Sequence, residues 1–236
     1  MIGGAWLPTA GQEDLLEAAV GAEDGVAAAW RRWRAVHDLE SIDAGSARLL
    51  PLLMPRLDRI PKDDDARRRI VGAYRRTFYH GNLLRARAAR ALAALHAAGL
   101  PTLVLKGGVL GAVHYADLAL RPMNDFDALV PATRGADAMR ALIADGWRTT
   151  HPLAERLPDA YHSAPLTSHD GLEFDVHWNL LQQANEPDVD SPAWQAAEPF
   201  TVMGVPTRRL CASDIVVVAC ARSSAATTPS GSSPVR

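Results

Sequence analysis

One stretch of the sequence, residues 103–130, constrains the fold more than any other. It begins with the apolar run Leu103–Leu105, which ends at Lys106-Gly107-Gly108. An apolar run of this length before two glycines is typical of a buried strand that enters a tight turn. Because residues 109–115 contain no proline, we expect a short helix to start directly on the glycines. The backbone N–H groups of this turn and helix would then point at one spot, which suits a phosphate group.

The end of the same stretch carries two carboxylates. Asp125 and Asp127 alternate with the apolar residues Phe126, Ala128 and Val130. Side chains of a strand point alternately to its two faces, so the carboxylates share one face and the apolar residues can be buried on the other. Neighbouring carboxylates repel each other unless a cation lies between them, and a divalent metal ion is the usual one. We therefore predict that Asp125 and Asp127 bind metal.

A later candidate strand, Leu172–Trp178, carries further polar side chains. Glu173, Asp175 and His177 share one of its faces. An Asp-Gly turn joins this run to the β-like run Tyr161–Thr167, which predicts a hairpin. If the hairpin lies beside the strand that carries Asp125 and Asp127, Asp175 supplies a third carboxylate to the same site.

The order of these motifs resembles a known family. The segments that carry the resemblance are Leu105-Lys106-Gly107-Gly108, Tyr115, Arg121-Pro122-Met123, Asp125-x-Asp127-x-Leu129-Val130 and Glu173-Phe174-Asp175-Val176-His177-Trp178. They resemble the signature of the DNA polymerase β-like nucleotidyltransferase superfamily and, more closely, its bacterial branch, the uncharacterised nucleotidyltransferase family. The resemblance covers roughly residues 82–180, and Asn124 stands where this branch often has glycine.

The resemblance implies a Mg²⁺-dependent enzyme that transfers a nucleoside monophosphate from an NTP, with ATP expected, to an acceptor hydroxyl. The acceptor could be a small molecule, a tRNA end or a protein side chain. Asp125, Asp127 and Asp175 would hold two Mg²⁺ ions, and Asp175 would help to position or deprotonate the hydroxyl. Gly107 and Gly108 would present backbone N–H groups to the β- and γ-phosphates. A Cβ at Gly108 would then crowd the phosphate.

Three other residues are candidates for the site, and two of them, Arg121 and His177, have two interpretations each. Lys106 and Arg121 are candidates to neutralise phosphate or the leaving pyrophosphate, and Arg is better suited to bidentate contact. Arg121 could equally form a salt bridge that only holds its loop. His177 is either a supporting partner of the carboxylates or simply a polar strand residue.

Two other function classes stay open. A zinc-dependent hydrolase would use His169, Asp170, Glu173, Asp175 and His177, although their spacing matches no established zinc pattern and leaves the two glycines without a role. A non-catalytic nucleotide-binding or interaction module on the same scaffold would bind NTP without turnover.

Composition excludes several classes of protein. With 48% hydrophobic and 22% charged residues among 236, the chain falls in the ordinary soluble class, and no apolar run is long enough to span a membrane. A net charge of −2 argues against a surface wholly committed to nucleic acid. Cys211 and Cys220 match no zinc or redox spacing, and no basic segment marks a secretory signal, so we expect a cytoplasmic protein.

The patterns predict an α+β fold. We expect a helical region over residues 1–98, an α/β core over 99–222 with a small mixed sheet flanked by helices, and a disordered tail over 223–236. Trp30 and Trp33 have helical spacing and predict a packing face. Residues 66–98 read as one long or slightly broken helix, with Gly81 and Asn82 as a candidate kink. The arginines between 67 and 90 form either a solvated face or a polyanion-binding face of this helix.

The C-terminal part of the chain carries two weaker expectations. Residues 180–197 are polar and contain prolines, which predicts a loop or lid. Family members generally continue into further helices after a helix such as Ile215–Ala221, whereas here a Ser/Thr/Pro-rich tail follows. The resemblance therefore suggests a truncated or frame-shifted member of the family.

Overall fold

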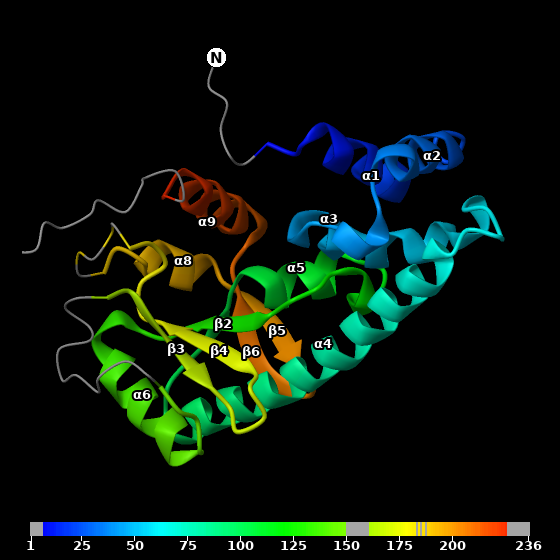
Figure 1. Cartoon of the computed structure of the whole chain (residues 1–236). Helices are drawn as coiled ribbons and strands as arrows, with labels where there is room; N and C mark the ends of the chain where they lie inside the picture. The colour runs from blue at the N-terminus through cyan, green and yellow to red at the C-terminus, as the bar shows by residue number, and fades with distance from the viewer. Residues whose placement is uncertain (1–6, 150–160, 183, 185, 187, 226–236) are drawn as a thin grey trace, which may run out of the picture. The chain divides into compact units, whose positions relative to one another are not determined.

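The computed structural model describes residues 7–149, 161–182, 184, 186 and 188–225 (Figure 1). The chain divides into two compact units, each described here by itself. The helical unit contains residues 6–83 and 111–123, and the sheet unit contains residues 84–110 and the described part of 124–236. The domain boundary expected between residues 98 and 99 stays a prediction.

The helical unit is built around two tryptophans. Its elements are α1 (Ala10–Val20), α2 (Val26–Val36), η1 (Leu39–Ser41), α3 (Ala44–Leu49), η2 (Leu50–Arg59), the first half of α4 (Ala66–Ala97), the end of α5 (Lys106–His114) and η3 (Leu118–Leu120). Trp30 and Trp33 are fully buried, with ring centroids 5.3 Å apart, and pack among leucines and alanines of α1 and η2. They form the packing face that their spacing predicts.

Helix α4 is one continuous helix of 32 residues. The side chain of Asp64 accepts a hydrogen bond from the N–H of Ala66 at 2.9 Å, which caps the first turn. The helix passes Gly81 and Asn82 without a break, and Gly99, at φ 71°, follows its end. A left-handed glycine in this position is the common way to end a helix, so the long helix predicted for residues 66–98 is confirmed.

The sheet unit contains a mixed sheet of six strands in the order β3-β4-β2-β1-β6-β5. The strands are β1 (Leu103–Val104), β2 (Asp125–Leu129), β3 (Ser163–Thr167), β4 (Glu173–His177), β5 (Glu198–Val202) and β6 (Val205–Arg209). Strand β2 runs parallel to β4, and β1 parallel to β6, while the other neighbours are antiparallel. The predicted β3–β4 hairpin is present, and Gly171 in its turn has a φ of 80°.

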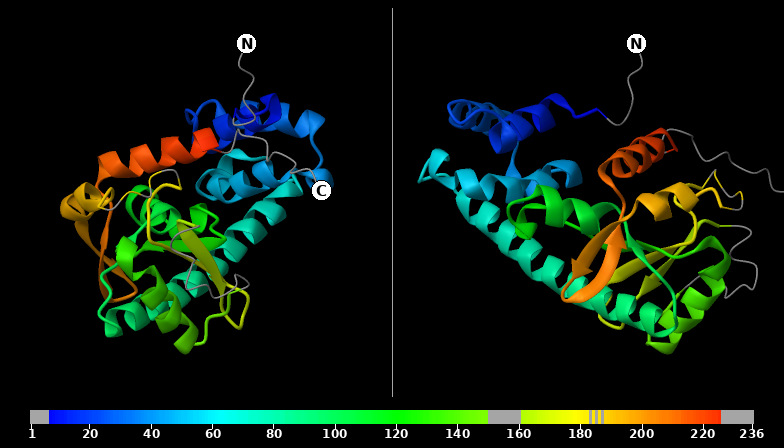
Figure 2. Two further views of the ribbon diagram at one scale, coloured as in Figure 1. Left: turned by 90° about the vertical axis from the view of Figure 1, so that its left-hand side faces the viewer. Right: turned by 180° about the vertical axis from the view of Figure 1, so that it is seen from behind.

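Helices cover the sheet on both sides. Helix α6 (Gly135–Ala144) and the second half of α4 lie on one side, and α8 (Ser191–Ala196) and α9 (Ala212–Ala225) lie on the other (Figures 1 and 2). Phe126, Phe174 and Trp147 pack their rings together, with centroids 5.5–6.1 Å apart between neighbours. The α+β class with a small mixed sheet flanked by helices is therefore confirmed.

Two C-terminal expectations change. A helix, α8, forms within residues 180–197, which were expected to be a loop, because Pro192 occupies its first turn, where a missing N–H costs no hydrogen bond. Helix α9 reaches Ala225, three residues into the expected tail, and the rest of that tail lies outside the described residues. None of the described helices is long and apolar enough to cross a bilayer.

Candidate active site

The register of two parallel strands brings the predicted carboxylates together. Asp127 of β2 lies opposite Asp175 of β4, and Asp125 lies opposite Glu173. Residues in register on neighbouring strands point to the same side of the sheet. The expectation that the Leu172–Trp178 strand lies beside the strand of Asp125 and Asp127 is thus confirmed, and Asp127 and Asp175 form a pair at the centre of the sheet.

A lysine from the glycine turn reaches this pair. The N–H of Leu105 donates to the carbonyl of Asp127 at 3.0 Å, which places the end of β1 beside β2. Lys106 follows with a φ of 43°, an uncommon conformation for a residue with a side chain. Its Nζ forms an ion pair with Oδ1 of Asp127 and lies 3.4 Å from Nε2 of His177. The turn therefore delivers a cation to the carboxylate.

His177 belongs to the same group. Its side chain is buried, and its Nε2 lies 3.0 Å from Oδ1 of Asp127, within hydrogen-bond distance. Ligand atoms of Asp127, Asp175 and His177 all lie within 4.8 Å of one another, the arrangement of a possible metal site. Of the two interpretations of His177, partnership with the carboxylates is the one that the structure shows. The two-residue spacing from Asp175 was the signal in the sequence.

The pKa values of Asp127 and Asp175 are shifted in opposite directions. Burial alone would raise the pKa of Asp127, but its hydrogen bond with His177 and the charge of Lys106 outweigh burial and hold the pKa below its usual range. Burial, together with repulsion from Asp127, Asp125 and Glu173, raises the pKa of Asp175 to about 6 against the opposing effect of Lys106. Asp127 is therefore the stably charged member of the pair.

The donor set suits a divalent metal ion. Carboxylate oxygens are the ligands of Mg²⁺, and an imidazole nitrogen beside them also suits Mn²⁺ or Zn²⁺. The ammonium of Lys106 compensates the negative charge of Asp127, as a metal cation bound there would. Asp125 raises the pKa of Asp175 through its charge but is not part of the three-residue group. Its predicted ligation of metal stays a prediction.

The glycine turn has a packing role that sequence reasoning missed. Helix α5 starts at Lys106, so Gly107 and Gly108 form its first turn. A Cβ on Gly108 would lie 2.8 Å from Cγ1 of Val104 and 2.9 Å from the ring of Phe126. The missing side chain of Gly108 thus points at the core of β1 and β2, which corrects the expectation that a Cβ there would crowd a phosphate. Phosphate binding by the backbone N–H groups stays a prediction.

Arg121 lies in the helical unit, directly after η3. Among the residues that the structure describes, no carboxylate lies within ion-pair distance of Arg121. In the described chain, Arg121 therefore has no partner for the salt bridge that would hold its loop. Its contact with phosphate stays a prediction.

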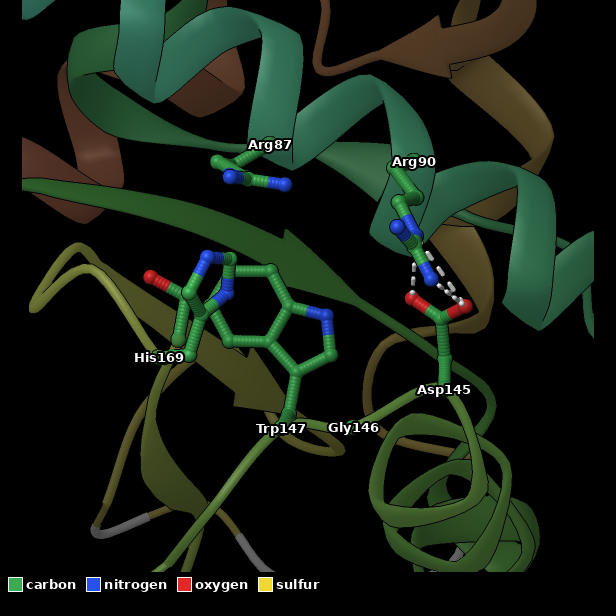
Figure 3. Close-up of a pocket in the computed structure, with 7 residues that line it drawn as sticks. Arg87, Arg90, Asp145, Gly146, Trp147 and His169 are labelled. Atoms are coloured by element: carbon green, nitrogen blue, oxygen red, sulfur yellow. Dashed lines mark hydrogen bonds and ion pairs between the residues drawn. The ribbon is translucent and has the colours of Figure 1, made fainter.

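The five residues of the alternative zinc site do not come together. Asp170 accepts hydrogen bonds from Arg87 at 3.0 Å and from the hydroxyl of Ser168 at 2.5 Å. His169 lines a cavity of about 260 Å³ with Arg87, Trp147 and the ion pair of Arg90 with Asp145 (Figure 3). In the described part of the chain, the group with metal-ligand geometry contains neither His169 nor Asp170. Of the five ligands of the hydrolase interpretation, only Asp175 and His177 belong to this group.

The chain was compared with models of protein families, with curated proteins and with solved structures. Residues 44–228 match the profile of a family described as an uncharacterised nucleotidyltransferase. Comparisons with curated proteins and with solved structures gave no significant match. The matched range includes the glycine turn, Asp127, Asp175 and His177, and it covers well over half of the chain. The chain therefore belongs to this uncharacterised nucleotidyltransferase family.

Proposed function

We propose that this protein transfers a nucleoside monophosphate from an NTP to the hydroxyl of an acceptor in a Mg²⁺-dependent reaction. The observation that carries the proposal is the register of Asp127 with Asp175, at the point where Lys106 arrives from the glycine turn. Carboxylates of the neighbouring strands β2 and β4 and a cation from the start of α5 meet there, as a reaction between a metal-bound triphosphate and a hydroxyl requires.

The carboxylates of the site are the proposed metal ligands. Asp127 and Asp175 would hold Mg²⁺ together with Asp125, and His177 would support Asp127 through the 3.0 Å contact. Two bound Mg²⁺ ions would supply Lewis-acid stabilisation of the phosphate charge and of the acceptor oxygen. With a metal ion held at Asp127, the ammonium of Lys106 would be available to pair with phosphate oxygens.

The chemical step is an in-line displacement at the α-phosphorus. The carboxylate of Asp175 takes the proton from the acceptor hydroxyl, and the hydroxyl oxygen forms a new bond to the α-phosphorus. The bond from the α-phosphorus to the oxygen that bridges to the β-phosphate breaks, and pyrophosphate leaves with that electron pair. Lys106 and Arg121, with the N–H groups of Gly107 and Gly108, compensate the charge of the phosphates. We take ATP as the first NTP to test.

A second candidate is nucleotide binding without turnover. It is favoured by the contacts of Asp127, whose charge is already compensated by Lys106 and whose Oδ1 lies 3.0 Å from Nε2 of His177. A carboxylate neutralised in this way can serve a binding module that never takes up catalytic metal.

Labelled nucleotides separate these functions. Purified protein, Mg²⁺ and cell extract are incubated with an NTP labelled at either the α- or the γ-phosphate, and the RNA, protein and small-molecule fractions are counted. We expect only the α-label to appear in one fraction, and the Asp127→Asn variant to lose it. Asp137→Asn, a surface carboxylate of α6, is the control that should keep activity. Transfer of the γ-label would show a kinase instead, and NTP binding without either label transferred would favour the second candidate.

A further inference from the structure

Three arginines on the first half of α4 have no acidic partner among the residues that the structure describes. Arg68, Arg75 and Arg76 are exposed, and none forms an ion pair with a carboxylate of the described chain. Of the other arginines of this helix, Arg67 donates to the carbonyls of Leu57 and Ile60, Arg69 pairs with Glu40, Arg87 with Asp170 and Arg90 with Asp145, while Arg85 is partly buried. The exposed arginines of α4 without an ion pair in the described chain therefore all lie on its first half.

Helical spacing places these arginines beside two exposed aromatic rings. Tyr79 is 72% exposed and Phe78 is 54% exposed, high values for such large side chains. Arg75 is three residues before Phe78 and four before Tyr79, and Arg76 is three before Tyr79, so Arg75 neighbours both rings and Arg76 neighbours Tyr79 on the helix surface. Phe78 and Tyr79 do not belong to the buried apolar side of α4, on which Ile70 is fully buried in the core.

A groove runs along the same part of α4. It encloses about 470 Å³ and is lined by Glu40, Asp65, Arg68, Arg69, Gly72, Ala73 and Arg76. Gly72 leaves it open, because a Cβ there would meet nothing within 4 Å. Both acidic residues are already engaged, Glu40 by Arg69 and Asp65 by Arg34 at 3.0 Å. The uncompensated charge of the groove comes from Arg68 and Arg76 and is positive.

We propose that this face of α4 binds single-stranded nucleic acid. Arginine presents a planar fork of N–H donors that matches phosphate oxygens, and three unpaired arginines supply the charge that a phosphate backbone requires. From Arg68 to Tyr79 the helix rises about 16 Å, enough to follow several phosphates. Phe78 and Tyr79 offer π-faces on which unpaired bases stack, whereas the bases of a duplex are already stacked on each other.

A membrane surface fits this face less well than nucleic acid. An interfacial helix inserts a broad apolar face between lipids, but the apolar stripe of α4 packs inside the protein. The site also uses none of the residues around Asp127, so it goes beyond the proposed transferase activity. Binding can be measured without metal or NTP, and Asp127→Asn should leave it unchanged, which keeps the two proposals separately testable.

The test uses the full chain and a fluorescein-labelled single-stranded RNA of 15 nucleotides with mixed sequence. Binding is followed by fluorescence anisotropy between 50 and 200 mM salt. We expect the logarithm of the affinity to fall against the logarithm of salt with a slope of about −2, as for three phosphate contacts to a single strand. Replacing Arg68, Arg75 and Arg76 together by Gln should weaken binding at least tenfold and flatten the slope.

Two further variants separate this site from general attraction between charges. Phe78→Ala with Tyr79→Ala should weaken binding about tenfold or more without changing the salt slope, because stacking carries no counterion release. Changing Arg31, Arg59 and Arg140 together to Gln alters net charge equally at exposed positions elsewhere and should leave binding unchanged. Equal losses in the two triple variants, no binding at 50 mM salt, or vesicles with anionic lipid competing equally well would each overturn the proposal.

Discussion

Asp127 and Asp175 carry the same side chain and lie opposite each other, but their surroundings differ. Asp127 is in contact with Lys106 and His177, which stabilise its negative charge. Asp175 is partly buried and faces the charges of Asp127, Asp125 and Glu173, which disfavour its own charge. Environments that separate the pKa values of two carboxylates are typical of sites where one of them moves protons.

Substitution of each aspartate by asparagine should therefore change stability in opposite directions. In protein treated with chelator, Asp127→Asn should lower the free energy of unfolding by about 1–3 kcal/mol, because it leaves Lys106 without its partner; the side chain of Lys106 is 22% exposed and can regain water. Asp175→Asn should raise it by about 1 kcal/mol through relief of repulsion. Urea denaturation measures both, and a loss of stability in both variants would contradict this description of the site.

At the scale of single elements, α5 shows why a Gly-Gly sequence has more than one possible meaning. The sequence predicts the turn and the helix, since both depend on neighbouring residues. Contact of Gly108 with Val104 and Phe126 depends on the pairing of β1 with β2, which joins residues far apart in the sequence. Conformation was therefore predictable and the packing role was not.

Gly108→Ala should destabilise the protein by about 1–3 kcal/mol, because its Cβ would press on two core side chains at 2.8–2.9 Å. Gly111→Ala, in the same helix, is the matched control. Its Cβ would lie 3.4 Å from Leu118 and 3.8 Å from Met123, so it should be neutral or stabilising through helix propensity. Thermal denaturation of the two variants compares them, and equal melting temperatures would remove the packing role of Gly108.

The N-terminus of α3 should make stability depend on pH. Hydrogen bonds from Ser46 and Gln12 lower the pKa of Asp43, the N-cap residue, to about 2. This pKa is below the value of about 3.9 that the side chain has in the unfolded chain. The ionised Asp43 therefore stabilises the folded protein fully above about pH 4, and this stabilisation is lost as the pH falls through about 2.

Asp43→Ala should therefore cost about 0.5–1 kcal/mol at pH 7, a low value for a cap because the side chain is exposed, and less at pH 2. Asp43→Asn keeps the capping oxygen and should show a smaller loss at pH 7. Denaturation in urea at pH 7, 4 and 2 tests the series. A cost for Asp43→Ala that stays constant over this range would show that the charge of Asp43 plays no part.

At the scale of the whole molecule, the predictable features are those that short segments specify. The long helix, the β3–β4 hairpin and the alternation of Asp125 and Asp127 with apolar residues follow from local spacing. The contact of Lys106 with Asp127 and the burial of His177 follow from strand order, and no local pattern specifies that order. The sequence thus identified residues of the site, while their partnerships required the fold.

Binding of a divalent ion should stabilise the protein as a whole, because the ligands of β2 and β4 are assembled only in the folded chain. Adding Mg²⁺ or Mn²⁺ to chelator-treated protein should raise its melting temperature, and an ion at 100 times its Kd adds about 2.7 kcal/mol. Asp127→Asn and Asp175→Asn should each abolish the shift, while Asp137→Asn keeps it. His177→Gln should weaken the binding of both ions without abolishing it, because His177 supports the carboxylate of Asp127. An undiminished shift in Asp127→Asn would mean that the ion binds elsewhere, and the transferase proposal would then lose its metal site.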